Sequence, residues 1–176
     1  YLLSNPVDLE GLYENLLTVG QLTGHEANAA SLNESLKIRV DKVAEKLATI
    51  SQEPLVYYEL DGSEPAKPWT PGPNTFLTKL IDMAGGKSVG EVLESDYAQI
   101  SLEELLIQDP DIIILGDSNY GVTADQVAER AGWSGLAAVQ SQAIYPFNDD
   151  LVSRPGPRLV DGLEGLTQLL HPELFK

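Results

Sequence analysis

The sequence predicts an α/β fold, namely a three-layer, Rossmann-like lobe with a mainly parallel sheet that is preceded by a long amphipathic helix. Short apolar runs, typical of strands buried on both faces, alternate with punctuated helical segments in the order β, α, α, β, α, β, α. This order is typical of parallel strands joined by right-handed crossovers. Apolar residues also recur every three or four positions after residue 25, which indicates one long helix with a single apolar stripe.

The chain begins with a predicted helix that runs from Pro6 to about Gly20. Asn5 suits the N-cap and Pro6 the first helical position, and Gly20 suits the end. The residues Thr23-Gly24-His25-Glu26 have the form of a capping box, which predicts the start of the long helix. The apolar stripe of that helix consists of Leu32, Leu36, Val40, Val43, Leu47 and Ile50.

Strands are predicted at residues 55–60, 112–115 and 143–147, where apolar and β-branched residues run together. A long loop over residues 61–74 follows the first strand and carries four prolines. We expect this loop to be stiff but without regular structure. Because it follows the carboxyl end of a strand, where open α/β sheets bind their ligands, Trp69 is either a pocket wall or a cover for the core.

Helices are predicted between and after the strands. The first covers residues 75–84 and is stopped by Gly85-Gly86, and another starts at Ser101. Thr123 starts a further helix, residues 133–139 form a short one, and residues 158–170 form the last. The inward side chains of the last helix are predicted to be Leu159, Val160, Leu163, Leu166, Leu169 and Leu170.

Composition restricts the partners of the chain. A chain of 176 residues with 43% hydrophobic residues suits one domain, or one domain with a helical arm. The net charge of −16 would repel phosphate backbones, so we expect no nucleic-acid partner. There is no cysteine and no apolar run of the roughly 18 residues that a membrane span needs.

Several motifs occur in an order that resembles a known family. These are Ala84-Gly85-Gly86, Ser101-Leu102-Glu103-Glu104-Leu105-Leu106, Asp109-Pro110-Asp111-Ile112-Ile113-Ile114-Leu115, Gly132-Trp133, Ala137-Ala138-Val139 and Ser153-Arg154-Pro155-Gly156-Pro157-Arg158. In this order they resemble the carboxy-terminal lobe of ABC-importer substrate-binding proteins for cobalamin, iron-siderophores and haem. The resemblance covers almost the whole chain.

The resemblance implies two Rossmann-like lobes joined by one long helix, with the ligand held between them and the lobe tips facing a membrane permease. Residues 1–24 resemble the end of a first lobe, 25–52 the interlobe helix and 53–176 the second lobe. We therefore expect a fragment of a two-lobed protein. The resemblance also implies a periplasmic or extracellular location, and whether the protein is free or lipid-anchored through a missing amino-terminal segment stays open.

Five residues are candidates for ligand contact. Two arginines bracket Pro-Gly-Pro at the mouth of a helix, which suggests an anion or partner contact. The resemblance implies that Arg154 points toward ligand oxygens and that Tyr97 replaces an aromatic pocket residue of a cobalamin binder. Tyr58, Trp69 and Tyr120 are expected at the carboxyl edge of the sheet. Leu151 and Val152 replace an aromatic pair of that cobalamin binder, which argues against a strict cobalamin assignment.

Docking to the permease is assigned by the resemblance to Glu103, at the start of the helix before the Pro-Asp strand. Glu104 is either a second docking residue or a capping residue. Arg158 is expected to form a structural ion pair with Asp161 or Asp149. His25 and His171 are expected to be structural, and the sequence indicates neither a metal site nor a cofactor.

The function that these observations favour is non-enzymatic capture of a metal chelate or corrinoid and its delivery to an ABC permease. A hydrolase is disfavoured because the two histidines lack a recognisable nucleophile–base setting, and a nucleotide-binding site because the phosphate loops are absent. The alternative is a non-transport surface receptor or sensor that uses the same lobe. A dimer is expected through the amino-terminal helix, whose apolar surface comprises Leu9, Leu12, Tyr13, Leu16 and Leu17.

Overall fold

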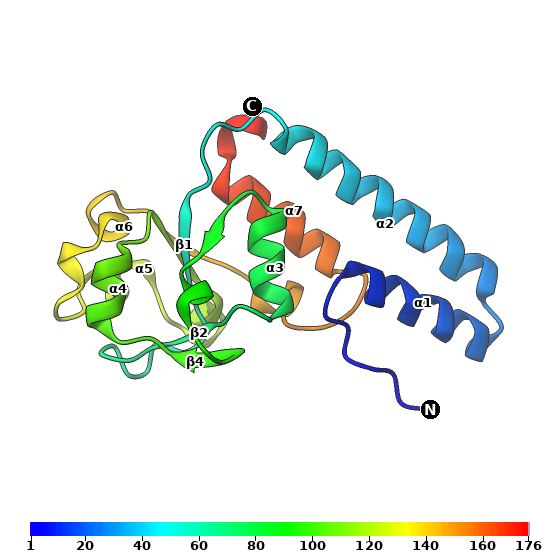
Figure 1. The fold of residues 1–176 in the computed structure, drawn as a ribbon, viewed down its shortest axis with the longest axis horizontal. Helices are drawn as coiled ribbons and strands as arrows, with labels where there is room; N and C mark the ends of the chain where they lie inside the picture. Colours follow the sequence, from blue (N-terminus) through cyan, green and yellow to red (C-terminus); the bar gives the residue numbers. More distant parts are fainter. Residues whose placement is uncertain (176) are drawn as a thin grey trace.

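The structure is a computed structural model that describes residues 1–175, and it confirms the predicted α/β class (Figure 1). The helices are α1 (Leu9–Thr23), α2 (Glu26–Leu47), α3 (Phe76–Met83), α4 (Leu102–Gln108), α5 (Ala124–Ala128), α6 (Ala137–Gln140) and α7 (Leu159–Leu170). The strands are β1 (Leu55–Glu59), β2 (Trp69–Pro71), β3 (Lys87–Ser88), β4 (Tyr97–Gln99), β5 (Ile112–Leu115) and β6 (Ile144–Pro146).

The main sheet has the order β3-β1-β5-β6, and every pair in it is parallel, as predicted. Strands β1 and β5 occupy its centre, with Val56 opposite Ile112 and Glu59 opposite Leu115. The predicted strands at residues 55–60, 112–115 and 143–147 correspond to β1, β5 and β6. The two-residue strand β3 was not predicted, because it is too short for an alternating pattern.

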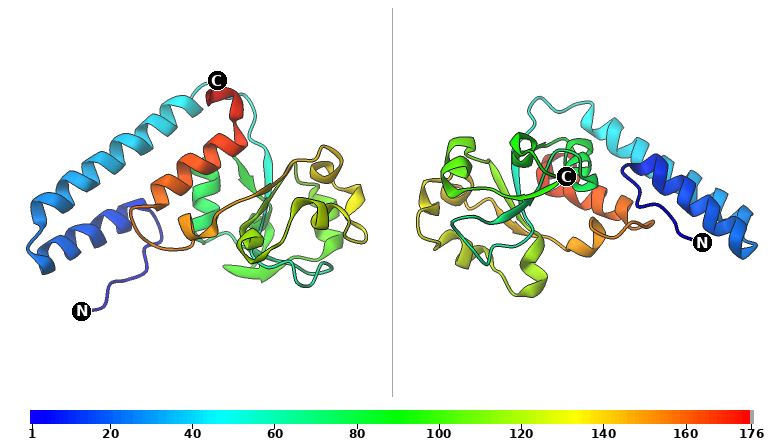
Figure 2. Two further views of the ribbon diagram at one scale, coloured as in Figure 1. Left: turned by 180° about the vertical axis from the view of Figure 1, so that it is seen from behind. Right: turned by 60° about the horizontal axis from the view of Figure 1, so that its bottom comes forward.

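The sheet is covered on both faces, which gives the predicted three layers (Figures 1 and 2). Val56, Tyr58 and Ile114 point into a core that is shared with α3, α7 and the α1–α2 pair. Tyr57 and Ile113 point to the opposite face, which α4, α5 and α6 cover. Since neighbouring side chains of a strand point to opposite faces, two-sided burial explains why these strands are apolar at every position except Glu59.

The predicted starts of α3, α4 and α5 are confirmed by their caps. The hydroxyl groups of Thr75, Ser101 and Thr123 each accept a hydrogen bond from the backbone N–H three residues later, at 3.1, 3.1 and 3.3 Å. Gln126 also accepts from the backbone N–H of Thr123, which completes a capping box. Helix α3 ends before Gly85, whose φ of +83° suits glycine. Local sequence therefore determines these helix boundaries.

Helix α1 is shifted along the chain from its prediction. Asp8, and not Asn5, caps it, and it ends at Gly24, which has a φ of +72°. Gly20 lies inside the helix, where a β-carbon would be 2.6 Å from that of Ala29 in α2. The glycine thus permits close helix crossing and does not end the helix. A local sequence pattern cannot distinguish these two uses of glycine.

The predicted capping box at Thr23 is wrong. The Thr23 hydroxyl group donates to the carbonyl of Val19 at 2.8 Å, within α1, and the first turn of α2 shows no side-chain capping bond from His25 to any described residue. Helix α2 ends at Leu47, so Ile50 lies outside it, and Leu32 is 37% exposed. The buried positions of α2 are Ala29, Asn33, Leu36 and Val43.

Helices α1 and α2 form a hairpin that lies against α7 (Figure 2). Asn33 donates from Nδ2 to the carbonyl of Tyr13 at 2.9 Å and joins the two helices in a buried place. Arg39 of α2 makes two hydrogen bonds to Glu164 of α7, at 2.9 and 2.6 Å, and a third to Asp161 at 2.6 Å. Asp161 therefore pairs with Arg39. It does not pair with Arg158, which was one of the two predicted pairings of that arginine.

The amino-terminal apolar surface is largely internal. Leu9, Leu12 and Tyr13 are buried in the core that α1 shares with α2 and the sheet, so they are not available for a dimer contact. The exposed apolar residues of α1 are Leu17, Val19 and Leu22, at 40, 41 and 59%. Within residues 1–175, no helix combines the length and the apolar character that crossing a membrane requires.

A second sheet occupies the segment that was predicted to lack regular structure. Strands β2 and β4 pair antiparallel, with Trp69 opposite Gln99 and Pro71 opposite Tyr97. Trp69 also forms a bridge with Asp61, which returns the loop to the end of β1. The prediction of an unstructured loop was wrong because the partner of β2 is distant in the sequence and β2 has only three residues.

Candidate functional site at the carboxyl edge of the sheet

The carboxyl ends of β1, β5 and β6 lie side by side, because these strands are parallel neighbours. Beyond them the chain forms two short 3-10 helices, Gly116–Tyr120 after β5 and Asp149–Leu151 after β6. The two-stranded sheet β2–β4 connects to the same edge through the bridge at the end of β1. Ligands of open α/β sheets bind at this edge, and most of the predicted ligand residues belong to it.

A small hollow brings two predicted regions together. It has a volume of about 80 Å³, and its lining includes Leu60, Phe76 and Tyr97 as well as Val152, Ser153 and Pro155. The segment that carries Arg154 therefore lines the same hollow as Tyr97. Small-molecule sites commonly measure 300–1,000 Å³, so this hollow is too small to hold a macrocycle.

Arg154 is accessible to a ligand. Its side chain is 69% exposed, and its Nε donates to Asp150 at 2.7 Å. This contact occupies one of five N–H donors of the guanidinium, and the others can bind carboxylate, catecholate or hydroxamate oxygens. Because an exposed ion pair contributes little to stability, Arg154 is free to exchange Asp150 for a ligand.

Tyr58 does not contact a ligand at the rim, contrary to the prediction. Its side chain is fully buried, and its hydroxyl group donates to Asp149 at 2.8 Å. Burial, followed by the charge of Asp149, raises the pKa of Tyr58, so this hydroxyl group stays protonated and remains a donor. Tyr58 thus anchors the 3-10 helix that precedes Arg154, and its role is to position that segment.

Trp69 and Tyr97 lie on the same face of the β2–β4 sheet. In the register observed, Trp69 opposes Gln99 and Tyr97 opposes Pro71, and residues two apart in a strand share a face. Their side chains are 41 and 60% exposed. Two aromatic side chains on one exposed face can stack on a flat or aryl ligand.

Tyr120 is 90% exposed at the end of the 3-10 helix after β5. It lines a second hollow of about 420 Å³, whose other residues are Leu60, Asp61, Gly62, Ser63, Asp117 and Val122. Leu60 lines both hollows, so the hollows of Tyr97 and Tyr120 both adjoin the chain that leaves β1. The predicted ligand residues therefore form a broad rim, and no single cavity collects them.

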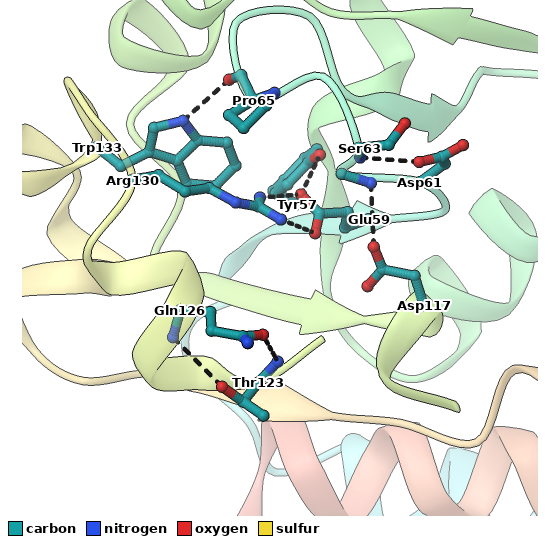
Figure 3. A network of polar contacts seen from close by, with 11 residues as sticks. Tyr57, Glu59, Asp61, Ser63, Pro65, Asp117, Thr123, Gln126, Arg130 and Trp133 are labelled. Carbon is teal, nitrogen blue, oxygen red and sulfur yellow. Dashed lines mark hydrogen bonds and ion pairs between the residues drawn. The ribbon is translucent and has the colours of Figure 1, made fainter. Parts of the chain in front are cut away.

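A buried charge cluster beneath this rim was not predicted (Figure 3). Glu59 is fully buried, and both of its oxygens accept hydrogen bonds from Arg130, at 2.5 and 2.9 Å. Tyr57 donates to the same carboxylate at 3.2 Å, and the ring of Trp133 lies 4.6 Å from the guanidinium carbon. The sequence does indicate an unusual carboxylate, because Glu59 ends a strand that is otherwise apolar. It does not show that Arg130 is the partner of Glu59.

The cluster also supports the loop that leads to Trp69. Trp133 donates from Nε1 to the carbonyl of Pro65 at 3.0 Å, and Asp117 accepts from the N–H of Gly62 at 3.0 Å (Figure 3). Ser63 donates its N–H to Asp61 at 2.8 Å, which tightens the turn between them. Buried charges that the rim does not expose therefore help to fix where the rim lies.

The two candidate docking residues differ in their environment. Glu103 is exposed in the first turn of α4, whereas Glu104 is half-buried and accepts from the side chain of Gln108 at 2.8 Å. The N–H of Glu104 also donates to Ser101. Glu104 is thus tied into its helix, and Glu103 is the one that extends into solvent.

Other parts of the chain contain fewer groups that are arranged to bind a ligand or a metal ion. Within the described residues, no three His, Asp or Glu side chains lie close enough together to hold a metal ion. His171 is buried with its Nε2 3.0 Å from the carbonyl of Gly85, a structural contact. An open hollow of about 980 Å³ lies at the opposite, amino edge of the sheet, lined by residues that include Glu53, Lys87 and Asp111.

The arrangement defines a class of protein, an α/β lobe with an exposed rim at the carboxyl edge of a parallel sheet. A model of the periplasmic binding protein family matches residues 1–151, and the chain belongs to that family. The chain is 30% identical over 165 residues to the ABC transporter substrate-binding lipoprotein YvrC of Bacillus subtilis. It is 32% identical over 170 residues to a cobalamin-binding protein of Halobacterium salinarum.

These two alignments cover 94 and 93% of this chain but only 51 and 44% of the relatives, so the chain spans about half their length. Among solved structures, an Fe3+-hydroxamate transport protein of Saccharomonospora viridis has a TM-score of 0.76 and 26% identity, over 91% of this chain and 55% of that one. The haem-binding protein RhuT of Roseiflexus has a TM-score of 0.84 and 19% identity, over 96 and 65%. This last likeness supports the fold alone.

The Glu59–Arg130 pair predicts a large effect of breaking it. Arg130→Met leaves a buried carboxylate without its cation, so we expect a loss of about 3–5 kcal/mol in the free energy of unfolding, measured by urea denaturation. Lys87→Met, which removes a surface pair with Glu53 at 3.2 Å, is the control and should cost less than about 1 kcal/mol. Equal losses in the two variants would contradict this description of the cluster.

Proposed function

We propose that this chain is a ligand-binding lobe of an ABC-importer substrate-binding protein that captures an iron-siderophore, haem or cobalamin outside the cytoplasm and delivers it to a permease. The observation that carries the proposal is that Tyr97 and the segment of Arg154 line one hollow at the carboxyl edge of the sheet. The family and the names of the relatives support this class of cargo. The role is binding and release, not catalysis.

Four of the predicted residues make up the proposed ligand contacts. Arg154 supplies a cation for acidic oxygens of the cargo, and Trp69 and Tyr97 supply a shared aromatic face. Tyr120 extends the rim at the second hollow, which Leu60 also lines. The buried Tyr58 is left out of this set because it acts through Asp149.

A second wall is needed to enclose such a cargo. The hollow beside Tyr97 holds about 80 Å³, and the chain spans about half of the relatives it matches. We propose that residues 1–24 end a first lobe, that 25–52 connect the lobes, and that 53–176 form the second lobe. In the structure the connecting segment contains α2, which lies along α7.

Delivery requires a surface that the permease can recognise. We propose Glu103 as the docking residue, because it is exposed while Glu104 bonds within its own helix. A carboxylate in this position suits a basic surface on the permease. The protein would then act in the periplasm or outside the cell, either free or held by a lipid anchor.

Ligand titration tests the cargo and its contacts. In the longest gene product that contains this chain, we expect saturable quenching of Trp69 fluorescence by one of cobalamin, haem or a ferric siderophore. Arg154→Ala should weaken that ligand by about ten- to hundredfold, because a hydrogen bond to a charged group is lost. Arg158→Ala is the matched control and should leave the affinity unchanged. A lack of response to all three classes would argue against the proposed cargo.

Docking can be separated from binding by reversing one charge. Glu103→Lys should keep the fold and the ligand affinity, because an exposed carboxylate contributes little to stability. Complex formation with the purified permease should fall at least tenfold, while the exposed substitution Glu45→Lys on α2 should not lower it. If Glu103→Lys formed the complex normally, Glu103 would not be the docking residue and the alternative of a non-transport receptor would gain support.

Self-association of the isolated chain is the last prediction here. Val19 and Leu22 lie one turn apart on the exposed side of α1, and we propose that they pair two copies of the chain. Sedimentation at concentrations on the order of tens of micromolar should show a dimer, which Leu22→Glu abolishes. Val92→Glu, at another exposed valine, is the control. A monomeric wild-type chain would contradict the proposal.

A further inference from the structure

The charge cluster beneath the rim contains more acid than base. Glu59 is fully buried and Asp117 is 5% exposed, and Arg130 is the cation that faces both. The nearby hydroxyl groups of Tyr57 and Tyr58 stay neutral, because burial raises the pKa of each. Two ionised carboxylates would therefore share one cation in a largely buried place. Such an arrangement is unfavourable unless one carboxyl group binds a proton.

Glu59 has more hydrogen-bond donors than Asp117. It accepts two hydrogen bonds from Arg130 and one from Tyr57, whereas Asp117 accepts one from the N–H of Gly62. A proton taken up by the cluster is therefore best placed on Asp117, the acid with fewer donors.

Asp117 has the geometry of a proton carrier. Its Oδ2 accepts from the N–H of Gly62 at 3.0 Å, whereas its Oδ1 is buried and has no hydrogen-bond donor among residues 1–175. Gly62, which donates to Asp117, also lies against the carboxylate of Glu59, so the two acids face the same turn. Burial, followed by the charge of Glu59, raises the pKa of Asp117 from 3.8 to about 6.

The proton would act on the turn that leaves β1. A β-carbon at Gly62 would overlap the guanidinium of Arg130 and the carboxylate of Glu59, so the turn rests directly on the ion pair. Gly62 is also hydrogen-bonded to Asp117. The next residues return to Trp69, whose N–H donates to the carbonyl of Asp61 at 2.9 Å. The turn thus connects the cluster to an exposed aromatic residue of the rim.

We propose that Glu59, Asp117 and Arg130 form a proton-binding cluster that fastens this turn, and through it Trp69, more firmly in mildly acidic than in neutral solution. In the acidic state, one proton taken from solvent is held by Asp117, and the charges of Glu59 and Arg130 balance. In the neutral state the proton is released and the two carboxylates repel. This proposal does not depend on the chemistry of the ligand, so its test is independent of the identity of the cargo.

The sign of the stability effect follows from the direction of the shift. For an acid whose pKa is raised on folding, the stabilising contribution is fully present below the unfolded value of about 3.8 and is lost as pH rises through about 6. Burial also raises the pKa of Asp82 to about 6, so wild-type stability alone does not isolate Asp117. The difference between wild type and a variant at position 117 cancels the contribution of Asp82.

The test is Asp117→Asn, which resembles the protonated acid at every pH. The Asn carbonyl can accept from Gly62, and the neutral amide does not repel Glu59. We expect Asp117→Asn to raise the melting temperature by several degrees at pH 7.5 and by about half as much at pH 5, because the unfolded acid is already ionised at pH 5 whereas the folded acid is not. Asp61→Asn is the control, because Asp61 is an exposed acid of the same turn, and it should keep the wild-type pH dependence.

NMR titration of the wild-type chain provides a second, independent measurement. The carboxyl carbon of Asp117, the amide of Gly62 and the indole N–H of Trp69 should titrate with one midpoint near pH 6, and Asp117→Asn should abolish it. A midpoint for Asp117 below about 4.5, or a destabilised Asp117→Asn at pH 7.5, would overturn the proposal. A titrating Gly62 with an unchanged Trp69 would overturn the connection to the rim.

Discussion

The parallel pairing of β1 with β5 is the constraint on which the rest of the structure depends. Both strands are buried on both faces, and their register places Glu59 opposite Leu115 at the carboxyl edge. The segments that leave this edge, at Leu60 and Gly116, are therefore neighbours. A β-carbon at Gly116 would overlap the ring of Tyr58, so this residue must be small where the chain turns away. The rim, its two hollows and the charge cluster all follow from this juxtaposition.

Much of this fold could be predicted from the sequence, because its determinants are local. Caps at Thr75, Ser101 and Thr123 and the apolar runs of β1 and β5 act within a few residues. The failures involve partners far along the chain. Strand β2 pairs with β4, and Gly20 permits a helix crossing, neither of which a local pattern shows.

The residues of the candidate site can also be divided into those with local determinants and those whose partners are distant in the sequence. The exposure of Tyr120 could be predicted because the residue follows a strand, whereas Tyr97 was assigned by the resemblance and lies in β4. The supporting residues could not, since Glu59 and Arg130 are 71 positions apart and their pairing depends on the finished fold. Tyr58 was assigned to the wrong group because residue type does not distinguish a rim tyrosine from one that anchors a loop.

Helix α2 is attached along much of its length, at Asn33 to α1, at Arg39 to α7 and at Lys46 to the carbonyl of Leu174. A helix that is attached at several points resists bending, so we expect α2 to be rigid and not to act as a hinge. If a first lobe is attached through α1, as we propose, the two lobes would move almost as a rigid body.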